Sequence, residues 1–158
     1  KDRFRFVSGT EGQVWSLQKF KNTLVCGQDQ GIFIISKGKA EKIPNTFGTW
    51  LIKEIIDQKD LLILGNYKGL YVLRNENDKW VVRNKINGFD SSSIHIEFIN
   101  PNELLVSHEQ KGVFQLKIDK EFKEVLSASK STIRKSINLP ITITTPSKPP
   151  STLHSNLQ

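Results

Sequence analysis

The chain has 158 residues, a formal net charge of +7, an apolar fraction of 37% and a single cysteine. This length is enough for one ordinary domain with a sizeable core, and no apolar run approaches the length of a membrane span. The lone Cys26 excludes an intramolecular disulfide and a thiolate metal cluster, and its apolar neighbours predict a small buried core residue.

The positive charge is divided unevenly along the chain. Residues 1–126 contain 19 Lys and Arg against 16 Asp and Glu, whereas residues 127–158 contain 4 against none. In the first part lysines alternate with acids, which is typical of a solvated surface and not of a stripe that follows phosphates. We therefore expect no nucleic-acid contact and no membrane insertion by this segment. If the parent protein is exported, its signal peptide is expected before Lys1.

In chain order, residues 1–12 resemble the end of a preceding structural unit, with a short strand candidate at residues 4–7. Three units follow, each with four short strand candidates separated by turn signals. The last strand of the third unit is predicted at residues 121–126. Apolar residues at helical spacing do not persist over a dozen positions, so we expect little helix. The predicted bounds of the three units are residues 13–43, 49–86 and 93–126.

The three units share one pattern, which is clearest in residues 60–73, DLLILGNYKGLYVL. A Leu-led apolar run reaches a small or polar residue, and four positions later a glycine is followed by an aliphatic and an aromatic residue. Two apolar runs around such a loop predict a β-hairpin, buried on both faces, with a positive φ at Gly69. The small or polar residues are Gly27, Gly65 and His108. The repeat glycines, which we predict to be structural, are Gly31, Gly69 and Gly112.

The repeat glycines lie 38 and 43 residues apart, a period typical of blades of four-stranded sheet. Propellers typically close with about four to eight blades, so three units are part of a longer ring. The sequence therefore predicts an all-β fold: a partial β-propeller of about three four-stranded blades.

The composition changes after Leu126. Residues 127–158 contain seven Ser, five Thr and four Pro, with no acid and no aromatic residue. Such a segment buries too little apolar area to offset its ordering entropy, so we expect a disordered low-complexity tail. A second hypothesis is a reading-frame shift, because the repeat stops where a fourth unit should begin. The coding DNA tests that hypothesis.

Three phrases of the repeat, LLILGNYKGLYVL, GTWLIKEI and KWVVRNKINGF, carry a family resemblance. Over residues 1–126 the chain resembles the two-component regulator propeller repeats of Bacteroidetes-type bacteria. It is most similar to the subset whose propeller precedes a three-tyrosine sandwich domain, a membrane helix and a LuxR-type helix-turn-helix. The chain departs from the Gly-Thr of the family motif, having Gly27-Gln28, Gly65-Asn66 and Ser107-His108 instead.

The resemblance implies a sensor: a periplasmic propeller whose ligand state is passed through the membrane to a transcriptional output. In the wider family the ligands are often oligosaccharides. The remaining blades and downstream domains of the parent protein are the implied partners. Two other classes stay open. One is a protein-interaction scaffold, although the Gly-His and Trp-Asp marks of tryptophan-aspartate repeats are missing. The other is a propeller enzyme such as a lyase or glycan hydrolase.

Candidate ligand-binding residues follow from the geometry of a propeller. Loops between second and third strands, and crossings between blades, meet at one face of the ring. Aromatic rings among amide and charged groups there suit a carbohydrate or a peptide ligand. Tyr67, at a hairpin tip, is the best candidate for an exposed aromatic residue. Trp50 and Phe89 either plug the space between blades or face a ligand, and Trp15 and Trp80 are predicted plugs. The candidate ligand-binding set is Tyr67, Asn66, Lys68, Trp50 and Phe89.

No catalytic set is expected from the sequence. The three histidines, His95, His108 and His154, have no carboxylate or cysteine at ligand spacing, so we predict no metal site. There is also no phosphate-binding glycine loop, nucleophile elbow or HExxH motif. We therefore predict no catalytic residue, no cofactor and no enzyme activity.

Overall fold

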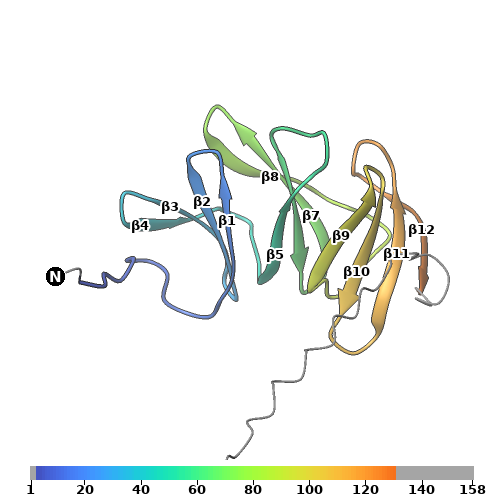
Figure 1. The fold of residues 1–158 in the computed structure, drawn as a ribbon, viewed down its shortest axis with the longest axis horizontal. Helices are drawn as coiled ribbons and strands as arrows, with labels where there is room; N and C mark the ends of the chain where they lie inside the picture. Colours follow the sequence, from blue (N-terminus) through green and yellow to red (C-terminus); the bar gives the residue numbers. More distant parts are fainter. Residues whose placement is uncertain (1–2, 131–158) are drawn as a thin grey trace, which may run out of the picture.

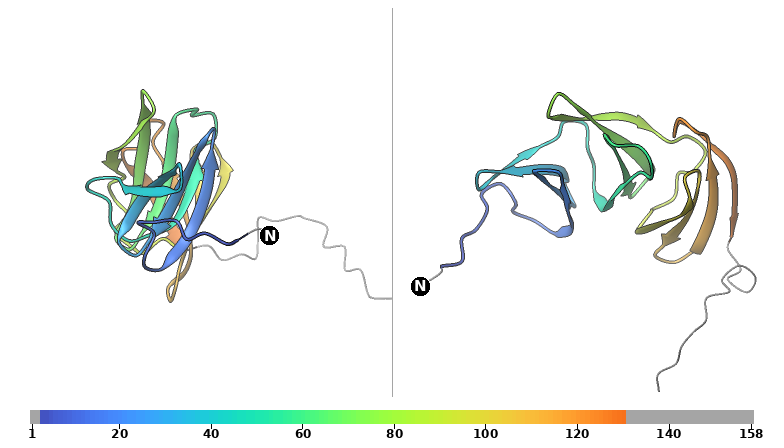
Figure 2. Two further views of the ribbon diagram at one scale, coloured as in Figure 1. Left: turned by 90° about the vertical axis from the view of Figure 1, so that its left-hand side faces the viewer. Right: turned by 45° about the horizontal axis from the view of Figure 1, so that its top comes forward.

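The computed structural model describes residues 3–130, which form twelve strands and no helix (Figure 1). Within this range there is accordingly no helix long and apolar enough to cross a membrane. The strands make three four-stranded sheets, which stand side by side in an open arc in the right-hand view of Figure 2. The predicted all-β partial propeller of three four-stranded blades is confirmed. The tail prediction for residues 131–158 lies outside the described residues.

In each blade the strands follow in sequence order from the inner to the outer edge, and all neighbours are antiparallel. The first blade consists of β1 (Val14–Phe20), β2 (Thr23–Gln28), β3 (Gly31–Ser36) and β4 (Lys39–Lys42). The second consists of β5 (Thr49–Glu54), β6 (Leu61–Asn66), β7 (Gly69–Glu76) and β8 (Lys79–Lys85). The third consists of β9 (His95–Asn100), β10 (Glu103–His108), β11 (Gly112–Ile118) and β12 (Val125–Lys130).

Strand β6 is the centre of the hydrophobic core. All six of its residues are buried, and alternate side chains point to opposite faces of the sheet. Leu62 and Leu64 join the apolar cluster shared with the first blade. Leu61 and Ile63 join the cluster shared with the third blade. The prediction that this hairpin is buried on both faces is confirmed, because the second blade is packed between two neighbours.

The repeat glycines begin the third strand of each blade with a positive φ. The angle is 140° at Gly31, 115° at Gly69 and 88° at Gly112, a region that residues with a Cβ rarely adopt. The positive φ predicted at Gly69 is therefore confirmed, and Gly31 and Gly112 share it. In the first two blades the φ reversal closes a loop of only two residues between the second and third strands.

The other glycine of the pattern lies where one blade meets the next. A Cβ on Gly27 would stand 2.9 Å from the carbonyl oxygen of Thr49 in the second blade. A Cβ on Gly65 would stand 2.1 Å from the carbonyl oxygen of Ser93, just before the third blade. Since real Cβ atoms do not approach backbone this closely, glycine is what allows the blades to meet at this distance.

In the third blade the matching residue is Ser107, not His108 as the sequence spacing indicated. Ser107 pairs with the residue after Gly112, as Gly65 pairs with the residue after Gly69. Counting back four positions from Gly112 gives His108 in place of Ser107, because the loop before Gly112 contains three residues instead of two.

The outer strand of the third blade was predicted at residues 121–126, but it runs from Val125 to Lys130. The reason is the Asp119 carboxylate, which accepts backbone hydrogen bonds from Glu121 (3.0 Å), Lys123 (2.7 Å) and Glu124 (2.6 Å). These bonds fold the residues after β11 into a turn, so the strand starts later. Residues 127–130, assigned from composition to the tail, therefore belong to the blade.

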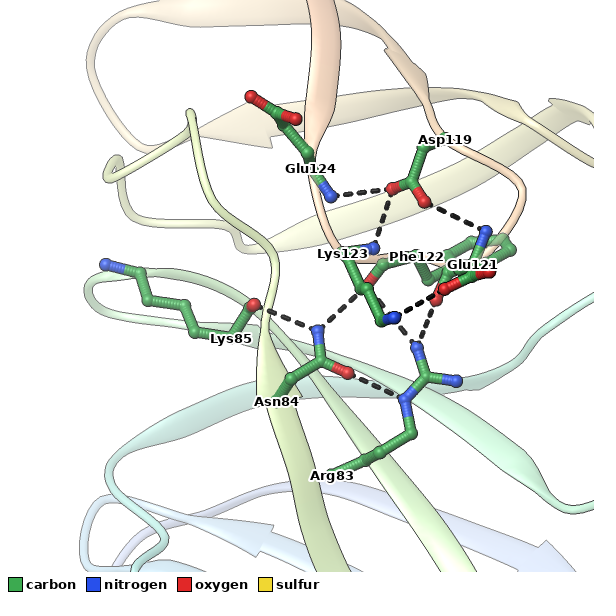
Figure 3. Close-up of polar contacts among 8 residues, drawn as sticks. All are labelled: Arg83, Asn84, Lys85, Asp119, Glu121, Phe122, Lys123 and Glu124. Carbon is green, nitrogen blue, oxygen red and sulfur yellow. Dashed lines mark hydrogen bonds and ion pairs between the residues drawn. The ribbon is translucent and has the colours of Figure 1, made fainter.

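The same turn fastens the third blade to the second (Figure 3). The Asn84 amide donates to the carbonyl oxygen of Phe122 at 2.9 Å, and the Arg83 guanidinium donates to that of Glu121. Phe122 has a positive φ of 56° and a buried ring that joins the core between these blades. The turn is therefore held to the second blade both by hydrogen bonds to its main-chain carbonyls and by the buried Phe122 ring.

The strand predicted at residues 4–7 does not form, because no other strand of the described chain lies beside it. Phe4 and Phe6 are exposed as a result.

We predict that Gly65→Ala destabilises the protein by about 2 kcal/mol or more, since a Cβ there overlaps the Ser93 backbone, which cannot rotate away. Ser107→Ala is the matched control, because that position of the repeat already carries a side chain, and it should cost less than about 1 kcal/mol. Urea unfolding monitored by circular dichroism measures both. Equal losses in the two variants would contradict the close approach of the blades at Gly65.

We also predict a pH-dependent contribution from Asp119. Burial alone raises the pKa of this carboxyl group, but its three backbone hydrogen bonds lower the pKa by more, so the net shift is downward. A lowered folded-state pKa stabilises the protein above the ordinary value near 3.9, and the gain is lost as the pH falls through the folded-state pKa.

Wild type should therefore exceed Asp119→Asn by about 1 kcal/mol at neutral pH, and the gap should shrink in acid. Urea unfolding of both proteins over a pH series measures it. A gap of constant size down to strongly acidic pH would refute this account.

Candidate functional site

The hairpin loops and the crossings, the segments that link one blade to the next, meet at one end of the sheets. In the first blade the amide of Asp29, at the β2–β3 loop, donates to the carbonyl of Gln13 at 3.2 Å. In the second blade the backbone amide of Tyr67, at the β6–β7 loop, donates to the carbonyl of Gly48 at 3.3 Å. Each loop tip is thus tied to the chain just before an inner strand, and the two blades present their loops side by side.

Two tryptophans enter this region from the inner strands β1 and β5. The pairing of β1 with β2 skips Trp15, and the pairing of β5 with β6 skips Trp50, so each is the extra residue of a β-bulge. A bulge turns its side chain away from the regular alternation of the strand. The two rings meet across the blade boundary with centroids 4.2 Å apart and planes tilted by 32°.

Tyr67 completes this aromatic cluster (Trp15, Trp50 and Tyr67). Its ring centroid lies 5.0 Å from that of Trp50 in an edge-on arrangement and 5.6 Å from that of Trp15. Such tilted and edge-on contacts are the favoured geometry between aromatic rings. A Cβ on Gly48 would stand 2.3 Å from Cε2 of Tyr67, so the phenol ring lies directly over the backbone of that glycine. The side chain remains 41% exposed and is available to a ligand.

Beside Tyr67 lies a pocket between the first two blades, which we call the interblade pocket. Its volume is about 610 Å³, within the range of pockets that bind small molecules. Phe47 is exposed at its edge, and Asp29, Lys42 and Lys68 provide charges of both signs. The pocket is lined by Asp29, Gln30, Lys42, Thr46, Phe47, Gly48, Asn66, Tyr67, Lys68 and Tyr71. It therefore offers apolar ring faces beside hydrogen-bonding groups.

The structure brings together four of the five predicted ligand-binding residues. Tyr67, Asn66 and Lys68 line the interblade pocket, and Trp50 lies in the adjoining aromatic cluster. Asn66 is buried, and its side chain hydrogen-bonds to the Thr49 hydroxyl at 2.9 Å, so its role in the isolated chain is to hold the loop.

Phe89 is not part of this region. It is 6% exposed, and its ring packs edge-on against Phe114 at 5.4 Å in the core between the second and third blades. Of the two interpretations of Phe89, the plug between blades is the one found.

Sequence reasoning treated Trp15 as a plug and missed its place in the cluster. The signal was present, because Trp15 and Trp50 occupy matching positions at the start of successive inner strands. Trp80, by contrast, is the buried plug that was predicted, with its ring 4.9 Å from that of Phe20.

The surroundings shift the pKa values of two groups, the Tyr67 phenol and the Glu109 carboxyl group. Burial, and secondarily the Asp29 carboxylate, raise the pKa of the Tyr67 phenol, so it remains a hydrogen-bond donor at physiological pH. The indole of Trp50 donates to the Ser92 hydroxyl at 3.1 Å. Glu109, at the third blade's loop, has a lowered pKa because its carboxylate accepts hydrogen bonds from its own amide and from Ser92.

The site contains groups for recognition. Over residues 3–130 there is no cluster of three or more His, Cys, Asp or Glu side chains that could hold a metal ion. His108 instead accepts hydrogen bonds from the amides of Gln110 (3.0 Å) and Lys111 (3.2 Å), which order the β10–β11 loop. Aromatic stacking and hydrogen bonding are the chemistry that the site can supply.

No protein-family model and no curated protein matches this sequence. Solved structures do match the fold, among them the crystal structure of the WD40 β-propeller domain of Doa1. The TM-score is 0.57 at 14% sequence identity, and the match covers 83% of this chain and 44% of that one. The described residues are therefore part of a β-propeller, and the chain spans less than half the length of that propeller domain.

We predict that Gly48→Ala displaces the Tyr67 ring at a smaller cost in stability than Gly65→Ala, because the added Cβ would strike a partly exposed side chain and not backbone. Near-UV circular dichroism, which reports on the packing of aromatic rings, should change clearly. The control is Gly38→Ala, where a Cβ meets nothing within 4 Å. It should leave the near-UV spectrum unchanged despite the strain of its positive φ. An unchanged spectrum for Gly48→Ala would contradict the placement of Tyr67.

Proposed function

We propose that this chain is part of a non-catalytic sensor propeller that binds an oligosaccharide in the periplasm. The parent protein would pass the bound state through the membrane to a transcriptional output. The family resemblance of the repeat supports the sensor role and the compartment.

The observation that carries the ligand proposal is the aromatic cluster beside the interblade pocket. A sugar ring has an apolar face, which stacks on aromatic rings, and a rim of hydroxyl groups, which need hydrogen-bond partners. Tyr67 offers a ring face that is partly open, with its neighbours Trp15 and Trp50 holding it in place. Asp29 and Lys68 lie in the adjoining pocket and supply an acceptor and a donor.

The position of the site between two blades also suits a sensor. Tyr67 belongs to the second blade, whereas Trp15, Asp29 and Phe47 come from the first blade and its crossing. A ligand that contacts both sets stabilises one relative position of the blades over others. Ligand binding can shift a conformational equilibrium only through such a difference in affinity between states.

A protein-interaction scaffold is the second candidate. It is favoured by the exposed Phe47, which is 61% accessible beside side chains of both charges. Aromatic residues are enriched in protein interfaces, which are surrounded by a polar rim. In this case the interblade pocket would receive an aromatic or aliphatic side chain of a peptide.

We predict that neutral and uronate-containing oligosaccharides include a ligand whose binding quenches tryptophan fluorescence, because Trp15 and Trp50 lie at the site. Tyr67→Ala should weaken that binding by at least about tenfold, which corresponds to about 1.4 kcal/mol. Phe6→Ala, which removes an exposed aromatic ring from the N-terminal segment, is the control and should bind normally.

Titration calorimetry with a glycan panel and a peptide library measures these affinities. Unchanged glycan binding by Tyr67→Ala would refute the proposed site. Binding of peptides alone, lost in Phe47→Ala, would establish the scaffold function instead.

A further inference from the structure

The segment before the first blade has the local structure of a crossing between blades. Thr46, in the crossing from the first to the second blade, donates its hydroxyl to the carbonyl of Ile43 at 2.7 Å. Thr10 makes the same bond to Val7, three residues earlier and also at 2.7 Å. The two segments therefore make the same turn, although one of them follows no described blade.

Backbone angles repeat in the same register. The residue before each threonine has a positive φ, 89° at Gly9 and 59° at Asn45, and Gly88 in the next crossing has 88°. Each of the first two segments also reaches a glycine two positions after its threonine, Gly12 and Gly48. Agreement in hydrogen bond, φ and sequence makes residues 7–12 a third crossing.

Residues 7–12 also make the hydrogen bond that the crossing before the third blade makes to the outer part of the blade that follows it. Asn87, in the crossing before the third blade, accepts a hydrogen bond from Val125 of β12 at 2.8 Å. Ser8 accepts the corresponding bond from Ala40 of β4 at 2.9 Å. Both are isolated parallel bridges to the outer strand of the blade that follows.

What the segment lacks is the blade behind it. Ile43 and Ile86, at the head of the other crossings, donate their amides to Ile32 (2.8 Å) and Leu70 (2.9 Å) in the third strand of their own blades. Val7 has the same place in the motif, but no third strand lies beside it among residues 3–130. The side chains before it are uncovered, with Phe4 108% and Phe6 72% exposed.

The register identifies what would cover Phe6. Phe6 precedes Val7 as Lys42 precedes Ile43 and Lys85 precedes Ile86. The stems of those lysines lie over the repeat glycines of their blades. Their Cε atoms are 3.0 Å from the position of a Cβ on Gly31 and 3.5 Å from that on Gly69. By the same register, the Phe6 ring would lie against the repeat glycine at the start of a third strand, and that strand would cover the ring.

We propose that residues 3–7 are the fourth strand of a further blade of the same propeller. The third strand of that blade begins at a glycine equivalent to Gly31, and it lies outside residues 3–130. A second copy of the chain does not fit this role, because β12 already pairs with β11 as the fourth strand of its last blade. The described arc spans less than half of the matched propeller domain, which leaves room for a further blade.

Hydrogen exchange measured by mass spectrometry tests this pairing in the full-length natural protein and in the 158-residue chain. The amides of Arg5 and Val7 should exchange at least about tenfold more slowly in the full-length protein, because only there do they find an acceptor strand. The amide of Ile43 is the control and should be protected in both. Fast exchange of Val7 in the full-length protein would overturn the proposal. Protection that rises with concentration in the 158-residue chain would overturn it in favour of a second copy.

Stability of matched variants provides an independent readout. Thr46 also accepts a hydrogen bond from the amide of Ile32 at 3.0 Å, so Thr46→Val should lower the urea midpoint of both proteins. Thr10→Val removes the bond to Val7 in both proteins, but it should lower the midpoint more in the full-length protein, where a third strand supplies the equivalent amide. A midpoint shift for Thr10→Val that is equally small in both proteins would refute the further blade.

Discussion

The fold depends on the contact between a glycine in one blade and the main chain of the next blade. Gly27 faces the carbonyl of Thr49, and Gly65 faces that of Ser93, at distances that a Cβ cannot occupy. These contacts let the apolar faces of neighbouring sheets close on each other, so that Leu62 and Ile63 of one strand reach two different cores. Because both apolar clusters combine residues of two neighbouring blades, the stability of each blade depends on its neighbours, as in other repeat proteins.

The close approach of the blades also creates the candidate site. Trp15 and Trp50 come from matching bulges in successive inner strands, and their rings meet only because the two blades are in contact there. Tyr67 lies over another glycine, Gly48, whose missing side chain leaves room for the phenol ring. The site is therefore a property of the boundary between blades, and a change in the spacing of the blades would alter the cluster and the pocket together.

The sequence predicted the blade architecture because glycine and apolar residues repeat with the period of a sheet unit. It also predicted Tyr67 at an exposed loop tip. The sequence did not distinguish the buried Phe89 from the partly buried Trp15, since both are aromatic residues near crossings and their burial depends on the neighbouring blade. The start of β12 was missed for a different reason: Asp119 binds three amides after it, and composition does not reveal that turn.

The most direct test of this account is an NMR measurement of contacts between blades in the 158-residue chain. The account predicts NOE cross-peaks between the α protons of Gly65 and the backbone of Ser93, and between those of Gly27 and Thr49. Cross-peaks within the second blade, between Gly65 and Leu70, provide the internal reference. If the reference cross-peaks are present and both interblade contacts are absent, the blades do not meet through their glycines and the account is wrong.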